Sequence, residues 1–98
     1  MYKYRITTTK NSTTEWYQKD PVIEAHLIES YINTEVMSMT TISDETSNDV
    51  SILIKEVTFL DEKSFLGFKA DPLVTAYINS RNAYEYNNSI VRIKENIV

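Results

Sequence analysis

The sequence predicts an α+β domain whose elements follow the order β-α-β-β-α-β. Residues 2–9 and 50–60 contain the alternating or β-branched patterns typical of strands. Asp-Pro pairs at positions 20–21 and 71–72 each precede apolar residues at helical spacing. The chain has 98 residues, 42% of them hydrophobic and 24% charged, which allows one globular core and no second one. We therefore expect residues 1–98 to form a single domain.

The first strand and the first helix are predicted from residues 2–33. The polar residues 10–14 form a loop, after which Trp16 and Tyr17 return the chain to apolar surface. The Asp20 carboxylate can accept a backbone N–H at a helix start, and Pro21 has no N–H to leave unpaired. Apolar side chains share one face at Tyr2, Tyr4 and Ile6 in the strand, and at Ile23, Leu27, Ile28, Tyr31 and Ile32 in the helix.

A β-hairpin is expected in the middle of the chain. Residues 36–42 are rich in Thr and Met, and residues 50–60 form the strongest β-branched run. The acidic and polar residues 43–49 between them predict a mobile loop and not a site. Asp44, Glu45 and Asp49 lack the glycine turn and the bidentate glutamate of a calcium loop.

The second half of the chain repeats the pattern of the first. Asp71 and Pro72 predict a helix that runs to about Arg81, with a possible extension to Tyr86, and residues 90–97 form the last strand. The helix starts lie 51 residues apart and their apolar positions correspond. Either an internal duplication or shared capping chemistry accounts for this correspondence.

This order of elements is the ferredoxin-like arrangement, in which two helices cover one face of a four-stranded antiparallel sheet. The predicted strands are apolar on both faces. In residues 50–60, one face carries Val50, Ile52 and Ile54 and the other carries Leu53, Val57 and Phe59. In residues 36–42, one face carries Val36 and Ile42 and the other carries Met37 and Met39. In the last strand, Ile90 lies on one face, and Val91 and Ile93 lie on the other.

An apolar outer face requires a cover, so we expect a homodimer whose two sheets pack face to face. The alternative is a β-bulge at Lys55 and Glu56. Such a bulge would turn all the apolar residues of that strand toward the helices and leave the outer face polar.

Composition excludes several classes of function. With no cysteine, the chain has no disulfide, thiolate metal site or cysteine nucleophile, and we expect a cytoplasmic location. A single glycine, Gly67, is incompatible with a phosphate-binding loop, and we expect no cofactor and no metal. The net charge of −4 opposes nucleic-acid binding, and no apolar run is long enough to span a membrane.

Residues 5–10 (RITTTK) and residues 77–80 (YINS), with Glu85 and Asn87 after them, resemble the dimeric α+β barrel superfamily, in particular small antibiotic-biosynthesis-monooxygenase-like proteins. Family members that resemble haem-degrading oxygenases carry tryptophan at the position of Tyr77 and histidine at the position of Asn87. An amide cannot ligate haem iron as imidazole does, so haem degradation is disfavoured. The resemblance to cofactor-free oxygenases implies that Tyr77, Tyr4, Trp16 and Arg92 bind and polarise a phenolic substrate.

Two hypotheses of function remain. In the first, a cytoplasmic homodimer binds a small aromatic or apolar molecule between sheet and helices, with cofactor-independent monooxygenase activity as the extension that the resemblance implies. In the second, the chain is a non-catalytic interaction or regulatory protein with no open pocket. The candidate ligand-binding residues are Tyr77, Asn87, Tyr4, Trp16 and Arg92.

Two ionisable residues of the first helix need separate consideration. His26, the only histidine, falls on the polar arc of the helix, so we expect it to face water. Glu24 falls within the apolar arc, where burial would raise its pKa and suit it to acid–base chemistry. Alternatively, Glu24 reaches water from the first helical turn, where the helix dipole favours negative charge.

Overall fold

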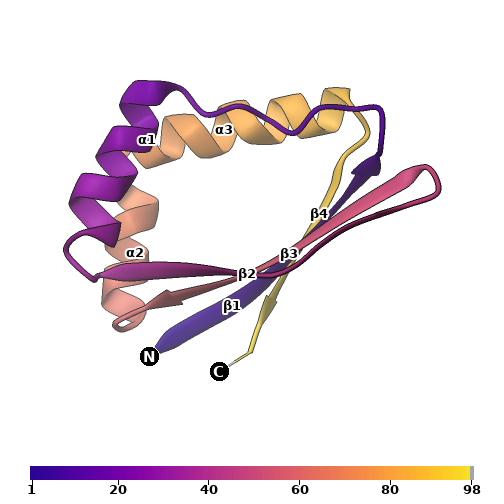
Figure 1. Cartoon of the computed structure of the whole chain (residues 1–98). Coiled ribbons are helices and arrows are strands. Elements are labelled where there is room, and N and C mark those ends of the chain that lie inside the picture. Colours follow the sequence, from indigo (N-terminus) through magenta and orange to yellow (C-terminus); the bar gives the residue numbers. More distant parts are fainter. Residues whose placement is uncertain (98) are drawn as a thin grey trace.

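A four-stranded antiparallel sheet with helices on one face forms the framework of the computed structural model, which describes residues 1–97 (Figure 1). The strand order is β2-β3-β1-β4, so the predicted α+β, ferredoxin-like fold is confirmed. Among residues 1–97, no helix is both long and apolar enough to cross a membrane. The strands are β1 (Tyr2–Asn11), β2 (Met37–Ser47), β3 (Val50–Phe59) and β4 (Val91–Asn96), and the helices are α1 (Pro21–Leu27), the π-helix η1 (Ile28–Ile32), α2 (Glu62–Ala70) and α3 (Pro72–Asn87).

Both Asp-Pro pairs begin helices, as the sequence predicts. The Asp20 carboxylate accepts a hydrogen bond from the backbone N–H of Val22 at 2.8 Å, and Asp71 accepts one from Leu73 at 2.9 Å. The helix that begins at Pro72 continues to Asn87, the longer of the two expected extents.

The helix α2 is an element that the sequence analysis did not predict. The Asp61 carboxylate caps it by accepting a hydrogen bond from the backbone N–H of Ser64 at 2.7 Å. Its apolar face is narrow, because only Phe65 and Phe68 are buried, three residues apart. The observed order of elements therefore has two consecutive helices between β3 and β4.

The predicted loop over residues 43–49 is wrong. Residues 43–47 pair with β3, and the connection is the two-residue turn at Asn48 and Asp49. Asn48 has a φ of 56°, a left-handed conformation that asparagine tolerates better than most residues, and this permits the tight turn. The polar side chains still pair across the hairpin, as Thr46 and Ser51 do through their hydroxyl groups at 2.8 Å.

The sheet bulge lies on β2 and not on β3. The pairing between β1 and β3 is continuous from Phe59 to Val50, so the alternative of a bulge at Lys55 and Glu56 is wrong. The register shift occurs between Thr41 and Ser43 on β2. Side chains therefore alternate between the two faces along the whole of β3. The face toward the helices carries Ser51, Leu53, Lys55, Val57 and Phe59, and the outer face carries Val50, Ile52, Ile54, Glu56 and Thr58.

The hydrophobic core occupies one end of the sheet, beneath α1 and α2. Phe59 and Val74 are fully buried there, and the backbone of α3 lies near α1 and α2 but stands off the sheet (Figure 1). The buried core residues are Tyr4, Leu27, Met37, Val57, Phe59, Phe65, Phe68 and Val74.

His26 was expected to be exposed but is half-buried, because it lies beside the start of α3. Its Nε2 is 2.6 Å from the Asp71 carboxylate, which also accepts a hydrogen bond from the Tyr31 hydroxyl at 2.5 Å. The hydrogen bond from Tyr31, followed by that from His26, lowers the pKa of Asp71 to about 2. The cluster ties the first helical segment to α3. Glu24, in contrast, is exposed, as its alternative placement in the first helical turn requires.

Candidate functional site

Two adjoining cavities lie between the sheet and the helices. One has a volume of about 190 Å³ and the other about 250 Å³. The first exceeds the roughly 150 Å³ of an apolar cavity that holds a benzene molecule. Because they share lining residues, we treat them as two compartments of one site. The shared residues are Lys19, Leu53, Lys55, Tyr77, Arg81 and Arg92.

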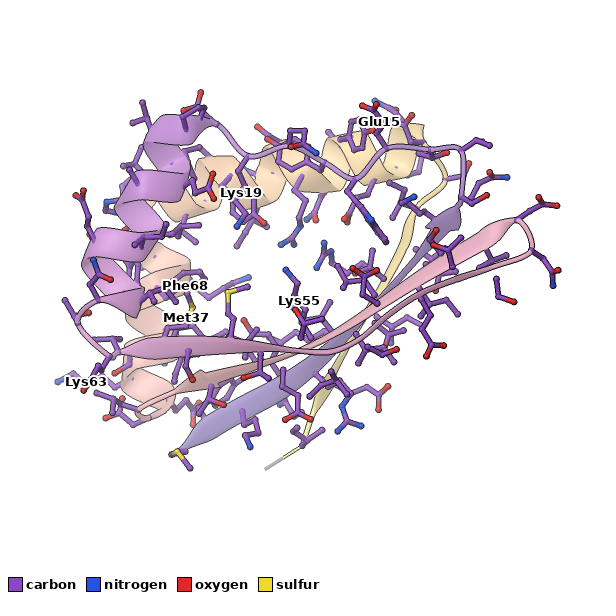
Figure 2. The ribbon with its side chains drawn as sticks, viewed as in Figure 1. Glu15, Lys19, Met37, Lys55, Lys63 and Phe68 are labelled. Atoms are coloured by element: carbon purple, nitrogen blue, oxygen red, sulfur yellow. The ribbon has the colours of Figure 1, made fainter. Side chains whose placement is uncertain are left out.

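The first compartment has an apolar interior that continues from the core. Its walls come from the inward faces of all four strands, from α1, α2 and α3, and from the segment before α1. Figure 2 shows Met37 and Phe68 at the end of the space near α1 and α2. The apolar lining residues are Ile6, Leu27, Met37, Met39, Leu53, Val57, Phe65, Phe68 and Ile78. Such a surface suits an aromatic ring or a short aliphatic chain.

Basic side chains surround this apolar interior. Lys55 points from β3 into the space beneath α3, and Lys19 points into the same space from the segment before α1 (Figure 2). Among residues 1–97, Glu85 is the only acidic residue that lines either compartment. The basic lining residues, six of the ten in the chain, are Lys19, Lys55, Lys69, Arg81, Arg92 and Lys94.

Glu85 is buried and holds two of these bases in place. The Arg92 guanidinium donates to both carboxylate oxygens, from Nε to Oε1 at 2.9 Å and from Nη2 to Oε2 at 2.7 Å. Arg81 Nε is 3.9 Å from Oε1, too far for a hydrogen bond, and it is buried with no acceptor within residues 1–97. This ion pair joins α3 to β4 across the wall of the site.

Two tyrosines contribute aromatic faces and hydroxyl groups. The Tyr4 ring lies 4.3 Å from Lys94 Nζ, and the Tyr77 ring centroid lies 5.4 Å from the Arg81 guanidinium carbon. Burial raises the pKa of Tyr4 to about 12, so its hydroxyl group remains protonated at neutral pH and can donate a hydrogen bond. Burial, and secondarily the charge of Lys69, lowers the pKa of Lys94.

Four of the five residues predicted from the sequence line this site. Tyr4, Tyr77 and Arg92 line the first compartment, and Trp16 lines the second, where Lys10 Nζ lies 4.6 Å from its ring centroid. Asn87 is exposed at the end of α3 and lines neither compartment, so we remove it from the candidate site.

Sequence reasoning missed most of the basic lining. Lys55 carried a signal, since it occupies an inward position between Leu53 and Val57 of an alternating strand. Arg81 also had one, four residues after Tyr77 and so on the same helix face. Lys19 carried none, because it belongs to an irregular segment with no periodicity.

Residues 1–97 contain no group of three or more histidine, cysteine, aspartate or glutamate side chains that could hold a metal ion. What the site offers is an apolar interior, two tyrosine hydroxyl groups and several positive charges. This combination can bind an amphipathic molecule and stabilise negative charge on it.

The comparisons with known proteins agree with the fold. The sequence matches no family model and no curated protein. Among solved structures, a designed protein, Foldit4, superimposes with a TM-score of 0.50 at 8% identity, covering 99% of this chain and 98% of that one. An ACT domain protein from Streptococcus pneumoniae gives a TM-score of 0.47 at 12% identity, covering 97% of this chain and 89% of that one. A hypothetical protein from Arabidopsis thaliana gives a TM-score of 0.49 at 16% identity, covering 99% of this chain and 88% of that one. At 8% identity, the likeness to Foldit4 concerns the fold alone.

Proposed function

We propose that this protein binds a small molecule with an apolar or aromatic body in the cavity between its sheet and its helices. The observation that supports the proposal is the cavity itself. Its apolar lining continues from the core, and Tyr4, Tyr77 and Arg92 contribute polar groups to the same space. A cytoplasmic location, expected from the sequence, is part of this proposal.

A more specific form of the proposal is cofactor-independent oxygenation of a phenolic substrate, as the resemblance to antibiotic-biosynthesis-monooxygenase-like proteins implies. Such chemistry converts a phenol and O2 into a quinone and water, and the substrate must first lose a proton to solvent. Arg81, Arg92 and Lys55 would stabilise the resulting phenolate in a partly desolvated space. The alternative, a non-catalytic protein with no open pocket, would be favoured by side chains packed around Tyr77 and Tyr4. The cavity volumes of about 190 and 250 Å³ favour ligand binding instead.

The proposal predicts that filling the cavity abolishes binding. Leu53 lines both compartments, so Leu53→Trp places an indole inside the site. We expect the variant to weaken binding of the uncharged fluorescent probe N-phenyl-1-naphthylamine by about tenfold or more, since it removes the space that the naphthyl ring needs. Fluorescence titration measures the affinity, and circular dichroism establishes that the variant is folded.

Leu66→Trp is the matched control. Leu66 is 56% exposed on α2 and lines neither compartment, so this variant should bind the probe as the wild-type protein does. Equal affinity of the Leu53→Trp variant and the wild-type protein, or no binding of the probe to either, would contradict the proposal.

We also propose that the protein is a homodimer that associates through the outer face of its sheet. We define the outer patch as Val50, Ile52, Ile54, Val91 and Ile93. The other end of this face is charged, with Arg5 donating to Glu56 at 2.7 Å. A two-fold axis can bring two outer patches together and leave the charged ends at the rim, which is the self-complementary pattern of a symmetric dimer. The patch residues Val50, Ile52, Val91 and Ile93 are 38% to 55% exposed.

Charges introduced into the outer patch should produce a monomer. We expect sedimentation at micromolar concentration to give twice the mass of one chain for the wild-type protein and the mass of one chain for Ile52→Glu/Ile93→Glu. The physical reason is that two buried, unpaired carboxylates in each subunit would have to be desolvated. Leu66→Glu, at an apolar residue of α2 that is 56% exposed and outside the patch, should remain dimeric. A monomeric wild-type protein would contradict the dimer and leave the ligand proposal intact.

A further inference from the structure

We infer that the ligand is an organic acid, in which an apolar or aromatic body carries a carboxylate. This inference rests on the proposed function and specifies its ligand class. The positive charge concentrated on the cavity, the unpaired Nε of Arg81 and the apolar enclosure each support it.

The distribution of charge within the chain is uneven. The protein has a net charge of −4, yet six of its ten basic residues line one space together with a single acid. Within residues 1–97, Lys19, Lys55 and Lys94 have no carboxylate within 4.0 Å, although the chain contains fourteen acidic residues. Like charges gathered without partners repel one another. A bound anion supplies the missing counter-charge.

The most favourable place for the carboxylate is beside Tyr77. The Tyr77 ring centroid is 5.9 Å from Lys19 Nζ and 5.4 Å from the Arg81 guanidinium carbon. Arg81 Nε is buried without an acceptor within residues 1–97, and such a group is costly to leave unpaired. A carboxylate there would accept from Arg81 and lie close to Lys19. Lys55 and Arg92 line the same two compartments.

The rest of the site selects an apolar body and not a polyanion. The compartment next to these bases is lined mainly by aliphatic and aromatic side chains, among them Leu27, Val57 and Phe68, with Lys69 and Lys94 as its other bases. A nucleic-acid backbone needs an extended basic surface, whereas these bases surround an apolar space of about 190 Å³. The matching molecule therefore has one anionic end and one apolar end.

Matched pairs of probes test the charge separately from the apolar body. We would titrate the full chain by calorimetry, at low ionic strength, with naphthalene-2-carboxylate against naphthalene-2-carboxamide, benzoate against benzamide, and octanoate against octanamide. Within each pair that binds, the carboxylate should bind about tenfold or more tightly than the amide, because each unpaired base contributes attraction at short range. Raising the salt concentration should reduce this preference.

The variant Lys19→Gln/Lys55→Gln should reduce carboxylate affinity by about tenfold while leaving amide affinity within about twofold. Lys63→Gln is the matched control, since Lys63 is exposed on the outside of α2 and lines neither compartment (Figure 2). Melting curves should show the double variant to be at least as stable as the wild-type protein, because it relieves repulsion. Equal binding of carboxylates and amides overturns the inference but preserves the proposed function. No binding of any probe overturns both, and a carboxylate preference unchanged in the double variant overturns the assignment of these two lysines.

Discussion

Replacing Phe59 with alanine should lower the free energy of unfolding by about 3–5 kcal/mol, a large part of the roughly 5–15 kcal/mol available to a domain of this size. Phe59 is fully buried on β3, and its ring centroid lies 5.2 Å from that of Phe68, 5.4 Å from that of Phe65 and 6.3 Å from that of Tyr4. Truncation removes the aromatic contacts on which α2 rests and leaves a void that these rings cannot fill. Urea denaturation at fixed protein concentration measures the effect.

The adjacent residue gives a direct control for this prediction. Leu60 is 59% exposed, so Leu60→Ala should change stability by no more than about 0.5 kcal/mol. Phe59→Leu keeps most of the buried volume and should recover more than half of the loss. If Phe59→Ala and Leu60→Ala unfold with the same midpoint in urea, the aromatic cluster is not the centre of the core.

The sequence predicted the features that depend on local chemistry. The Asp-Pro pairs begin helices because a carboxylate and a missing N–H satisfy the first turn regardless of what the helix later contacts. Alternation in residues 50–59 predicted both faces of β3, since the period of a strand is independent of its partners. These local rules determined the α+β class and the order of the elements along the chain, apart from α2.

The features that were missed depend on tertiary contacts. The helix α2 buries two phenylalanines and carries no longer apolar pattern, so packing against β3 and Tyr2 decides its conformation; the Tyr2 and Phe65 rings stack with centroids 4.3 Å apart. Residues 43–47 look like a loop in composition, yet they pair with β3 because Asn48 makes the turn tight. Composition cannot distinguish a polar edge strand from a loop.

The candidate site was predicted in its aromatic part and in one of its bases, Arg92. Tyr4, Tyr77 and Trp16 stood out because aromatic side chains with polar groups are common in pockets. The lysines were missed because isolated lysines are usually exposed, and Lys19, Lys55 and Lys94 come from three separate segments that only the fold brings together. Positive charge in a cavity is thus a property of topology here, and the overall charge of −4 conceals it.

Glu85→Gln should lower the stability of the protein and raise its affinity for a carboxylate ligand. Glu85 is 5% exposed and both of its carboxylate oxygens accept hydrogen bonds from Arg92, so Glu85→Gln leaves a guanidinium without its counter-charge. Because Arg92 keeps 26% exposure, we expect a loss of about 3 kcal/mol, the lower end of the range for a broken buried ion pair. The same substitution removes the only acid lining the site among residues 1–97, so naphthalene-2-carboxylate should bind more tightly. At an effective dielectric constant of about 20, removing a like charge this close to the carboxylate should raise its affinity about tenfold or more at low salt.

Denaturation and calorimetry on the same samples separate the two effects. Glu29→Gln is the control, because Glu29 is exposed on η1 and makes no ion pair within residues 1–97, and it should change neither property. In Glu85→Met/Arg92→Met both partners are apolar, so stability should recover relative to Glu85→Gln, whereas carboxylate affinity should fall because a base has been lost. If Glu85→Gln instead lowers carboxylate affinity in a folded protein, Glu85 acts on the ligand through the position of Arg92 more than through its own charge. An unchanged stability would mean that water already screens the pair, and the cavity would then be too wet for its bases to select an acid.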